Sequence, residues 1–301
     1  DERDMESQLL DTMDIERERG ITIKSNAVRV SYDADDGETY QFNLIDTPGH
    51  VDFTYEVSRS LAACEGAVLV VDATQGVEAQ TVSNASLAMN ANLDIVPAIN
   101  KIDLPSAHPD EVKAEIEDDL AIPADDAVCV SGKTGEGIHD LLESIVFLIS
   151  PPKGNAAGPL KALILDSYFD EYRGVVATVR VFDGSIKKGD RLLMMQAKGD
   201  FLVDGVGVKR PAETPVDALT VGEVGYVVTG LKDPEAVHVG DTLTWVDNPC
   251  DEPLPGYREA KPMVYTGLFP IDNKDYESLR DALEKLHVND PSLIWEPETS
   301  V

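Results

Sequence analysis

The sequence has few cysteines and no long apolar run. Its 301 residues include three cysteines, Cys64, Cys129 and Cys250, an odd number without metal-ligand spacing. This pattern predicts neither a disulfide framework nor a cysteine-ligated zinc site, and it fits a reducing cytoplasm. No apolar run reaches the roughly 18 residues of a membrane span, and no signal peptide is visible.

Basic residues are also scarce. The chain carries 25 Lys and Arg against 56 Asp and Glu, a formal net charge of −31. Nucleic-acid phosphates attract basic surfaces, so the composition does not itself indicate an RNA-binding face. The acidic residues concentrate at 33–38 and 115–119, which we interpret as solvated, self-repelling surface.

The most informative segment that is present is Asn100-Lys101-Ile102-Asp103, which follows the apolar run 93–99. Such a run predicts a buried parallel strand, and ligands bind where these strands end. The Asp103 carboxylate can accept hydrogen bonds from N1–H and the exocyclic amine of guanine, whereas adenine would leave it unpaired. Asn100 can brace the loop and reach N7, and the Lys101 stem can lie along the base. The alternative is a polar turn after a core strand.

A second segment, Asp46-Thr47-Pro48-Gly49-His50, follows the predicted strand 40–45. Asp46 can hold Mg²⁺ through a water, and His50 can orient an attacking water. Gly49 allows a terminal phosphate to approach its backbone N–H. The alternative is an ordinary turn, since Pro and Gly are turn residues.

Two shorter segments add weaker signals. Thr22, in Arg19-Gly20-Ile21-Thr22-Ile23, can ligate Mg²⁺ while the terminal phosphate is present and release it afterwards. Ser131-Gly132-Lys133 follows the short apolar run 127–130, and its backbone N–H groups can meet the guanine O6. Thr22 could instead be a strand residue, and Ser131-Gly132 a plain loop.

Together these segments resemble the switch I, switch II and base-specificity motifs of the translational GTPases, position for position. The stretches 14–19, 264–270 and 275–283 indicate one particular branch of this family. Elongation factor G-like and BipA-like GTPases, which share the switch motifs, are the alternative branches. Ser131-Gly132-Lys133 departs mildly from the family's more usual Ser-Ala-Lys, a change that backbone contacts tolerate.

The resemblance implies a ribosome-associated enzyme that hydrolyses GTP to GDP and phosphate with Mg²⁺. Its implied partners are ribosomal RNA, ribosomal proteins and tRNA, with large-subunit RNA completing the site around His50. It also implies a bacterial cytoplasmic location, peripheral membrane association, and a role in fidelity, back-translocation or ribosome assembly. A non-catalytic ribosome-binding scaffold is the alternative of a different class.

The phosphate loop G-x-x-x-x-G-K-[ST], which cradles the α- and β-phosphates, is absent from the sequence. The Gly132-Lys133-Thr134 triplet does not supply it, because the required earlier glycine would fall at Ala127. We expect the chain, which starts at Asp1 without an initiator Met, to be an internal part of a longer protein. By itself it is expected to bind GTP poorly.

The predicted fold class is an α/β G domain of the P-loop GTPase type, N-terminally incomplete, over 1–152. A hairpin is predicted at 28–32 and 40–44, and buried strands at 67–71 and 95–99. Alternating strands and helices predict a mostly parallel sheet with helices on both faces. Helices are predicted at 78–90 and 138–149. Their apolar residues at helical spacing are expected to face the core: Val82, Ala85, Met89, Leu141, Leu142, Ile145 and Leu148.

Two further domains are predicted after a Pro/Gly-rich linker at 151–159. Short β-rich runs over 160–248 predict a closed antiparallel β-barrel, the domain that faces the small ribosomal subunit in the family. Residues 261–301 predict the first half of a ferredoxin-like α+β domain. It would comprise a strand from Pro262, a helix at 276–286 and a strand at 293–295. Tyr265, Phe269 and Trp295 are expected in its core, and stacking on bases is the alternative.

Overall fold

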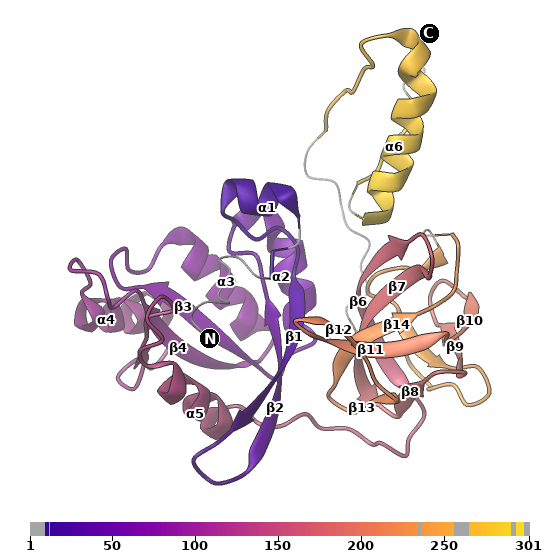
Figure 1. Cartoon of the computed structure of the whole chain (residues 1–301). Helices are drawn as coiled ribbons and strands as arrows, with labels where there is room; N and C mark the ends of the chain where they lie inside the picture. Colours follow the sequence, from indigo (N-terminus) through magenta and orange to yellow (C-terminus); the bar gives the residue numbers. More distant parts are fainter. Residues whose placement is uncertain (1–9, 12, 234–235, 256–264, 290–292, 298–301) are drawn as a thin grey trace. The chain divides into compact units, whose positions relative to one another are not determined.

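Parallel and antiparallel strands lie in different parts of this chain (Figure 1). The computed structural model describes residues 10–11, 13–233, 236–255, 265–289 and 293–297. These residues form two compact units, 1–152 with 209–212 and 153–208 with 213–301.

The first unit is built on a parallel sheet of order β3-β4-β5, with strands Gly66–Asp72, Asp94–Asn100 and Val128–Cys129. Asp72 lies opposite Asn100, and Ile99 lies opposite Cys129. The predicted strands 67–71 and 95–99 are confirmed. Because parallel strands point the same way, the loops after all three begin at one edge of the sheet, where ligands bind in such folds.

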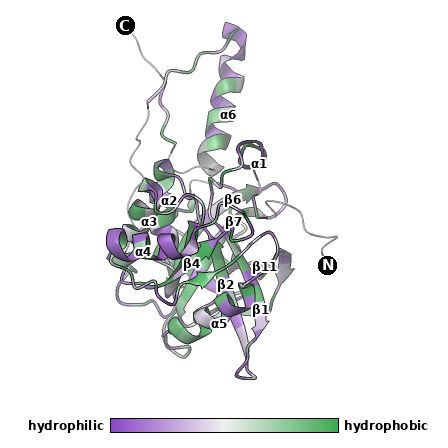
Figure 2. Ribbon diagram, turned by 90° about the vertical axis from the view of Figure 1, so that its left-hand side faces the viewer, coloured by the Kyte–Doolittle hydropathy of each residue, from purple (hydrophilic) through white to green (hydrophobic). Residues whose placement is uncertain are grey.

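The described residues of this unit form the helices α1 Asp14–Arg19, α2 Thr54–Leu61, α3 Ala79–Asn90, α4 Pro109–Leu120 and α5 Ile138–Leu148. A short 3₁₀ helix, η2 Val51–Phe53, precedes α2. The α4 ribbon is hydrophilic over most of its surface (Figure 2). Its three apolar residues at four-residue spacing, Val112, Ile116 and Leu120, are the buried ones. This spacing places one stripe of the helix in the core.

The inward faces of α3 and α5 were predicted only in part. Ala85 and Ile145 are buried as expected, but Val82, Met89 and Leu148 are exposed. Ala88 is the second buried residue of α3, so alanines rather than larger side chains form its inner face. After α5, Ile149 takes the inward position: a Cβ on Gly66 would lie 2.5 Å from its Cδ1. Small residues thus allow neighbouring elements to pack closely at positions where larger side chains were predicted to fill the core.

The predicted hairpin at 28–32 and 40–44 is confirmed and is longer than expected. Strands β1 Asn26–Asp33 and β2 Thr39–Asp46 pair antiparallel along their whole length. They form a two-stranded sheet of their own and, within the described residues, do not hydrogen-bond to β3, β4 or β5. The loops after β2 and β4 therefore leave two different sheets.

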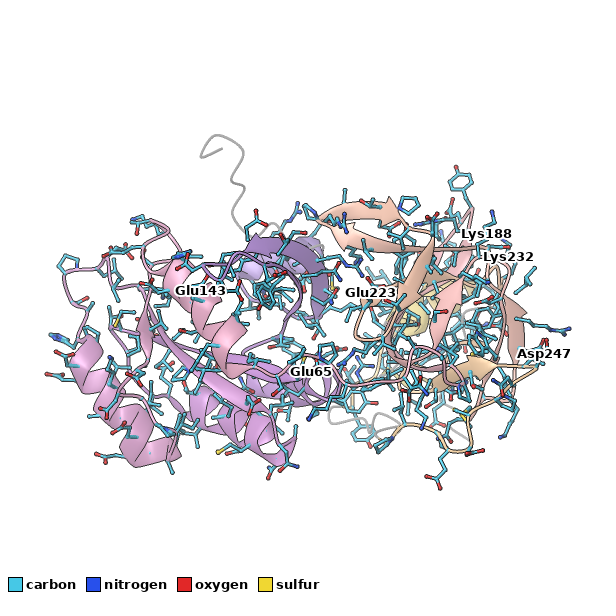
Figure 3. The ribbon with its side chains drawn as sticks, turned by 90° about the horizontal axis from the view of Figure 1, so that it is seen from below. Glu65, Glu143, Lys188, Glu223, Lys232 and Asp247 are labelled. Atoms are coloured by element: carbon cyan, nitrogen blue, oxygen red, sulfur yellow. The ribbon has the colours of Figure 1, made fainter. Side chains whose placement is uncertain are left out.

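The second unit is an antiparallel, barrel-like sheet of order β10-β9-β15-β6-β7-β14-β11-β12, with a separate β13-β8 pair. Its strands are β6 Lys161–Asp170, β7 Gly174–Asp183, β8 Ser185–Lys187, β9 Arg191–Met194, β10 Asp200–Leu202, β11 Gly205–Arg210, β12 Ala212–Pro215, β13 Ala218–Thr220, β14 Val224–Val228 and β15 Thr242–Trp245. Alternate residues of β7 and β6 enter one apolar core. Charged side chains such as Lys188 and Asp247 lie on the outside (Figure 3).

Beyond the sheet, the predicted helix is confirmed as α6 Tyr276–Asn289, after a 3₁₀ turn, η4 Asn273–Asp275. The strands predicted beside it are wrong for the described residues 265–270 and 293–297, which contain none, because a strand requires a paired neighbour. Residues 262–264 lie outside the described part. Tyr265 and Phe269 are exposed rather than in a core.

Of the helices that the structure describes, none combines the length and apolar composition that a membrane span requires.

Gly137, directly before α5, provides a test of this packing. Its φ is +72°, and an added Cβ would lie 2.1 Å from the Cys129 carbonyl oxygen. Gly135 also has a positive φ, +82°, but nothing lies within 4 Å of its Cβ position. Gly137→Ala should lower the free energy of unfolding by about 1–3 kcal/mol more than Gly135→Ala, because only Gly137→Ala adds a backbone clash to the shared strain. Urea unfolding followed by circular dichroism measures the difference, and equal effects would contradict this packing.

Candidate functional site

The amide of Asn100 joins the loops that follow β4 and β5. Its Oδ1 accepts hydrogen bonds from the backbone N–H of Lys101 at 2.8 Å and of Gly132 at 3.0 Å. Lys101 has φ +67°, a left-handed conformation that turns the chain sharply at the strand end. The Asn100 side chain therefore joins the two loops that are predicted to read guanine.

Asp103 is positioned by Ser131. The buried Ser131 hydroxyl donates to Asp103 Oδ1 at 2.7 Å and accepts from the Thr134 N–H at 3.1 Å. The sequence indicated Ser131 for its backbone, and the structure adds this role for its side chain. With Oδ1 fixed, the orientation of the whole carboxylate is restricted.

Lys101 forms an ion pair that the sequence did not reveal. Its Nζ lies 2.6 Å from Oδ2 of Asp72, at the end of β3. Burial raises the pKa of Asp72, but hydrogen bonds from Lys101 and Thr74 outweigh it, and the pKa lies below its ordinary value. The Lys101 stem is therefore directed across the strand ends. The structural reason for the pair is the strand register, which places Asp72 directly opposite Asn100, the residue before Lys101.

The other three residues predicted to bind guanine have different surroundings. Ile102 donates its N–H to the Val130 carbonyl at 3.3 Å and packs against the core of the first unit. Gly132 and Lys133 are exposed. A Cβ on Gly132 would meet only the Asn100 amide, at 3.7 Å, so the protein itself leaves space there.

Two buried carboxylates that the sequence analysis did not single out, Asp11 and Glu16, hold Thr22 and the residues that follow it. The Thr22 hydroxyl donates to Asp11 Oδ1 at 3.0 Å. Glu16, fully buried in α1, accepts from the N–H groups of Met13, Ile23 and Lys24, each at 2.9 Å. A buried carboxylate is stabilised when several N–H groups point at it. Glu16 therefore fixes the backbone on both sides of the Thr22 loop.

Asp46 carries an unbalanced negative charge. Loss of hydration raises its pKa, and the nearby charges of Asp11 and Glu16 raise it further. The Thr22 hydroxyl can donate to Asp11 while its oxygen lone pairs remain able to bind a cation. Hard oxygen ligands with excess negative charge suit Mg²⁺. These residues fit the predicted magnesium ligands.

Gly49 and His50 lie in the loop between β2 and η2. Asn84 of α3 donates to the Gly49 carbonyl at 3.1 Å. A Cβ on Gly49 would meet nothing nearer than Gln80 Oε1 at 3.9 Å. His50 Nδ1 accepts from the Asp52 N–H at 3.2 Å and lies 3.4 Å from Asp52 Oδ2. In the neutral ring the proton is then on Nε2, which leaves an N–H available to donate.

The predicted residues thus form three groups: the base loops, the Thr22–Asp46 carboxylate group and the Gly49–His50 loop. Hydrogen bonds join the members of the first group, and Asp11 links Thr22 to Asp46 by a hydrogen bond and by charge. Within the described residues, no hydrogen bond or ion pair connects the first group to the other two.

Comparisons with known proteins agree with the motifs. The family model "Elongation factor Tu GTP binding domain" matches residues 1–151, and "Elongation factor Tu domain 2" matches 174–244.

Similar curated proteins are those named "Elongation factor 4", the branch, also known as LepA, that 14–19 and 264–270 indicated. The protein from Staphylococcus saprophyticus is 59% identical over 298 residues, and that from Staphylococcus epidermidis 58%. Each alignment covers 99% of this chain and 49% of the relative. The chain spans about half the length of the curated relatives it matches. A solved structure from Thermus thermophilus shares the fold, with TM-score 0.74 and 20% identity over 96% of this chain and 56% of the other.

The role of Glu16 can be tested by hydrogen exchange. Glu16→Gln removes the negative charge to which the Ile23 and Lys24 amides both donate at Oε1, and its NH₂ group cannot accept from the Met13 N–H at the other position. Exchange at these two amides should accelerate at least about tenfold, because charge-assisted hydrogen bonds are lost in a buried place. Glu18→Gln, on the exposed side of the same helix, is the matched control. Equal exchange in the two variants would show that Glu16 does not hold the loop.

Proposed function

Because this chain belongs to the translational GTPase family, we propose that the complete gene product hydrolyses GTP to GDP and phosphate in association with the ribosome. Residues 1–152 would provide the guanine-reading and water-positioning parts. Residues 160–248 would contact the ribosome, and 261–301 would begin a third domain. Cofactors are GTP or GDP, with Mg²⁺.

The observation that carries this proposal is the arrangement of the β4 and β5 loops. Asn100 holds the Gly132 N–H beside the loop of Lys101, and Ser131 orients Asp103. The fixed Asp103 carboxylate can accept from the N1–H and the exocyclic amine of guanine, and the exposed residues Gly132 and Lys133 follow Ser131 in the adjoining loop. An adenine base would leave that carboxylate without hydrogen-bond partners. This lowers the binding affinity, because the bound nucleotide keeps water away from the carboxylate.

His50 is proposed to orient the attacking water rather than to remove its proton first. Its Nδ1 is occupied by the Asp52 N–H, so the nitrogen that can face the nucleotide is a donor in the neutral ring. Gly49 leaves open space beside its backbone, and a terminal phosphate can use it. Catalysis of this kind depends mainly on positioning and charge stabilisation.

Thr22 and Asp46 are proposed to hold Mg²⁺, with Asp46 acting through a water. When bound, the ion would neutralise charge on the β- and γ-phosphate oxygens. The raised pKa of Asp46 supports a cation at this place, because the ion would offset the repulsion from Asp11 and Glu16. Loss of the terminal phosphate would release Thr22 and its loop.

Ribosomal RNA, ribosomal proteins and tRNA are the proposed partners, in the bacterial cytoplasm. They follow from the resemblance, since the net charge of −31 does not favour RNA. Peripheral membrane association, back-translocation and a role in ribosome assembly stay predictions from the resemblance.

His50→Ala in the complete gene product tests the proposal. Ribosome-stimulated GTP hydrolysis should fall at least about a hundredfold, because the water is no longer positioned. The GTP dissociation constant should change less than about twofold, since His50 does not read the base or hold the β-phosphate.

His108→Ala is the control, because His108 is an exposed histidine of the same unit outside the three groups. Undiminished turnover in His50→Ala would remove His50 from the reaction. Absence of hydrolysis in the unsubstituted protein with ribosomes would favour the scaffold alternative.

A further inference from the structure

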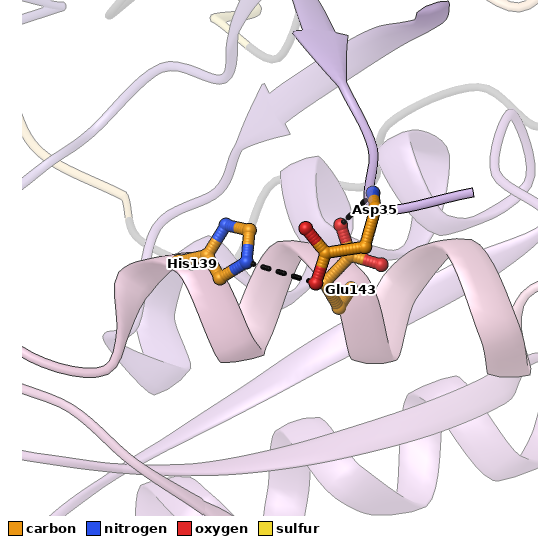
Figure 4. Close-up of side chains that lie close together, drawn as sticks. All are labelled: Asp35, His139 and Glu143. Carbon is orange, nitrogen blue, oxygen red and sulfur yellow. Dashed lines mark hydrogen bonds and ion pairs between the residues drawn. The ribbon is translucent and has the colours of Figure 1, made fainter. Parts of the chain in front are cut away.

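Three metal-ligating side chains meet away from the proposed nucleotide groups. Asp35 lies in the turn between β1 and β2, and His139 and Glu143 lie one turn apart on α5 (Figure 4). Residues i and i+4 of a helix share a face, so His139 and Glu143 project together toward the hairpin. Figure 3 shows Glu143 on the surface of the first unit.

The spacing of these groups suits a small cation. One ligand atom from each residue lies within 4.8 Å of the others. His139 Nε2 lies 3.3 Å from Asp35 Oδ2. Two ligands about 2.1 Å from a tetrahedral metal lie about 3.4 Å apart, so this pair is already at the edge length of a zinc site.

Tyr32 determines which nitrogen of His139 faces the cluster. The Tyr32 hydroxyl donates to Glu143 Oε1. Its oxygen lies 2.9 Å from His139 Nδ1 and accepts from it. Nε2 then faces the Asp35 carboxylate at 3.3 Å. Either a proton on Nε2 or a metal ion coordinated by both atoms satisfies this pair.

We propose that Asp35, His139 and Glu143 form a binding site for a divalent transition metal of the Zn²⁺ type. An imidazole nitrogen with two carboxylates favours Zn²⁺ over Mg²⁺ or Ca²⁺, which prefer oxygen ligands only. Three protein ligands leave a fourth position for water. The site uses none of the three cysteines, which is why the cysteine pattern did not predict it.

The three ligands are accessible to a metal ion from solvent, and a bound ion would link two elements of the first unit. The Asp35 and His139 side chains are 73% and 57% exposed. The ion would fasten the β1–β2 turn to α5, and this hairpin connects the Thr22 loop to the Asp46 loop. The Tyr32–His139–Glu143 contacts would hold the ligands in orientation, as hydrogen-bonded partners of metal ligands do.

Calorimetric titration of the chain with ZnCl₂ tests the proposal, with the visible absorption of bound CoCl₂ as a second readout. We expect one Zn²⁺ per chain with a dissociation constant of about 10 µM or lower. His139→Gln should weaken binding at least about tenfold, and Tyr32→Phe by about tenfold through loss of ligand orientation. His108→Gln is the matched control and should bind like the unsubstituted chain.

Two results would overturn the proposal. One is the absence of Zn²⁺ binding up to about 1 mM, which would leave the cluster as a hydrogen-bonded ion pair. The other is equal Zn²⁺ affinity in His139→Gln and His108→Gln, which would place the ion elsewhere. Circular dichroism of both variants confirms that the fold is retained, and the exposed position of each histidine favours this.

Discussion

One amide oxygen, Asn100 Oδ1, joins the two loops that we propose to read guanine. Asn100 Oδ1 receives N–H groups from its own loop and from the loop after β5, so the two loops keep a fixed separation. This bridge is possible because β4 and β5 pair in parallel and end together. Ser131 and Asp103 then lie within hydrogen-bonding distance. The Ser131–Asp103 and Ile102–Val130 hydrogen bonds join the same two loops, so the proposed guanine site rests on three contacts with the Asn100 bridge among them.

Charge compensation differs between two carboxylates at strand ends. Asp72 has Lys101 as a counter-ion, and its pKa lies below the ordinary value. Asp46 has Asp11 and Glu16 nearby instead, and its pKa is raised. The first arrangement is complete within the protein and stabilises the loops. The second would gain stability from a bound cation, which is the physical reason for proposing Mg²⁺ there rather than beside Asp72.

Local patterns in the sequence were sufficient for the strands and the motifs. The apolar runs gave β3 and β4, and turn residues between alternating segments gave the β1–β2 hairpin. Side chains that act across long sequence distances were not predictable. Glu16 binds amides seven and eight residues away, and Tyr32 contacts a helix more than a hundred residues later. Likewise, Ala85 and Ala88 face the core because neighbouring elements approach closely, which periodicity alone does not show.

Base selectivity of Asp103→Asn in the complete gene product is the most direct measurement. Xanthine carries a carbonyl oxygen where guanine carries its exocyclic amine, so the asparagine NH₂ can donate to xanthine but not accept from guanine. GTP affinity should fall at least about a hundredfold while affinity for xanthosine triphosphate rises. Unchanged GTP affinity, with no gain for xanthosine triphosphate, would show that these loops do not read guanine.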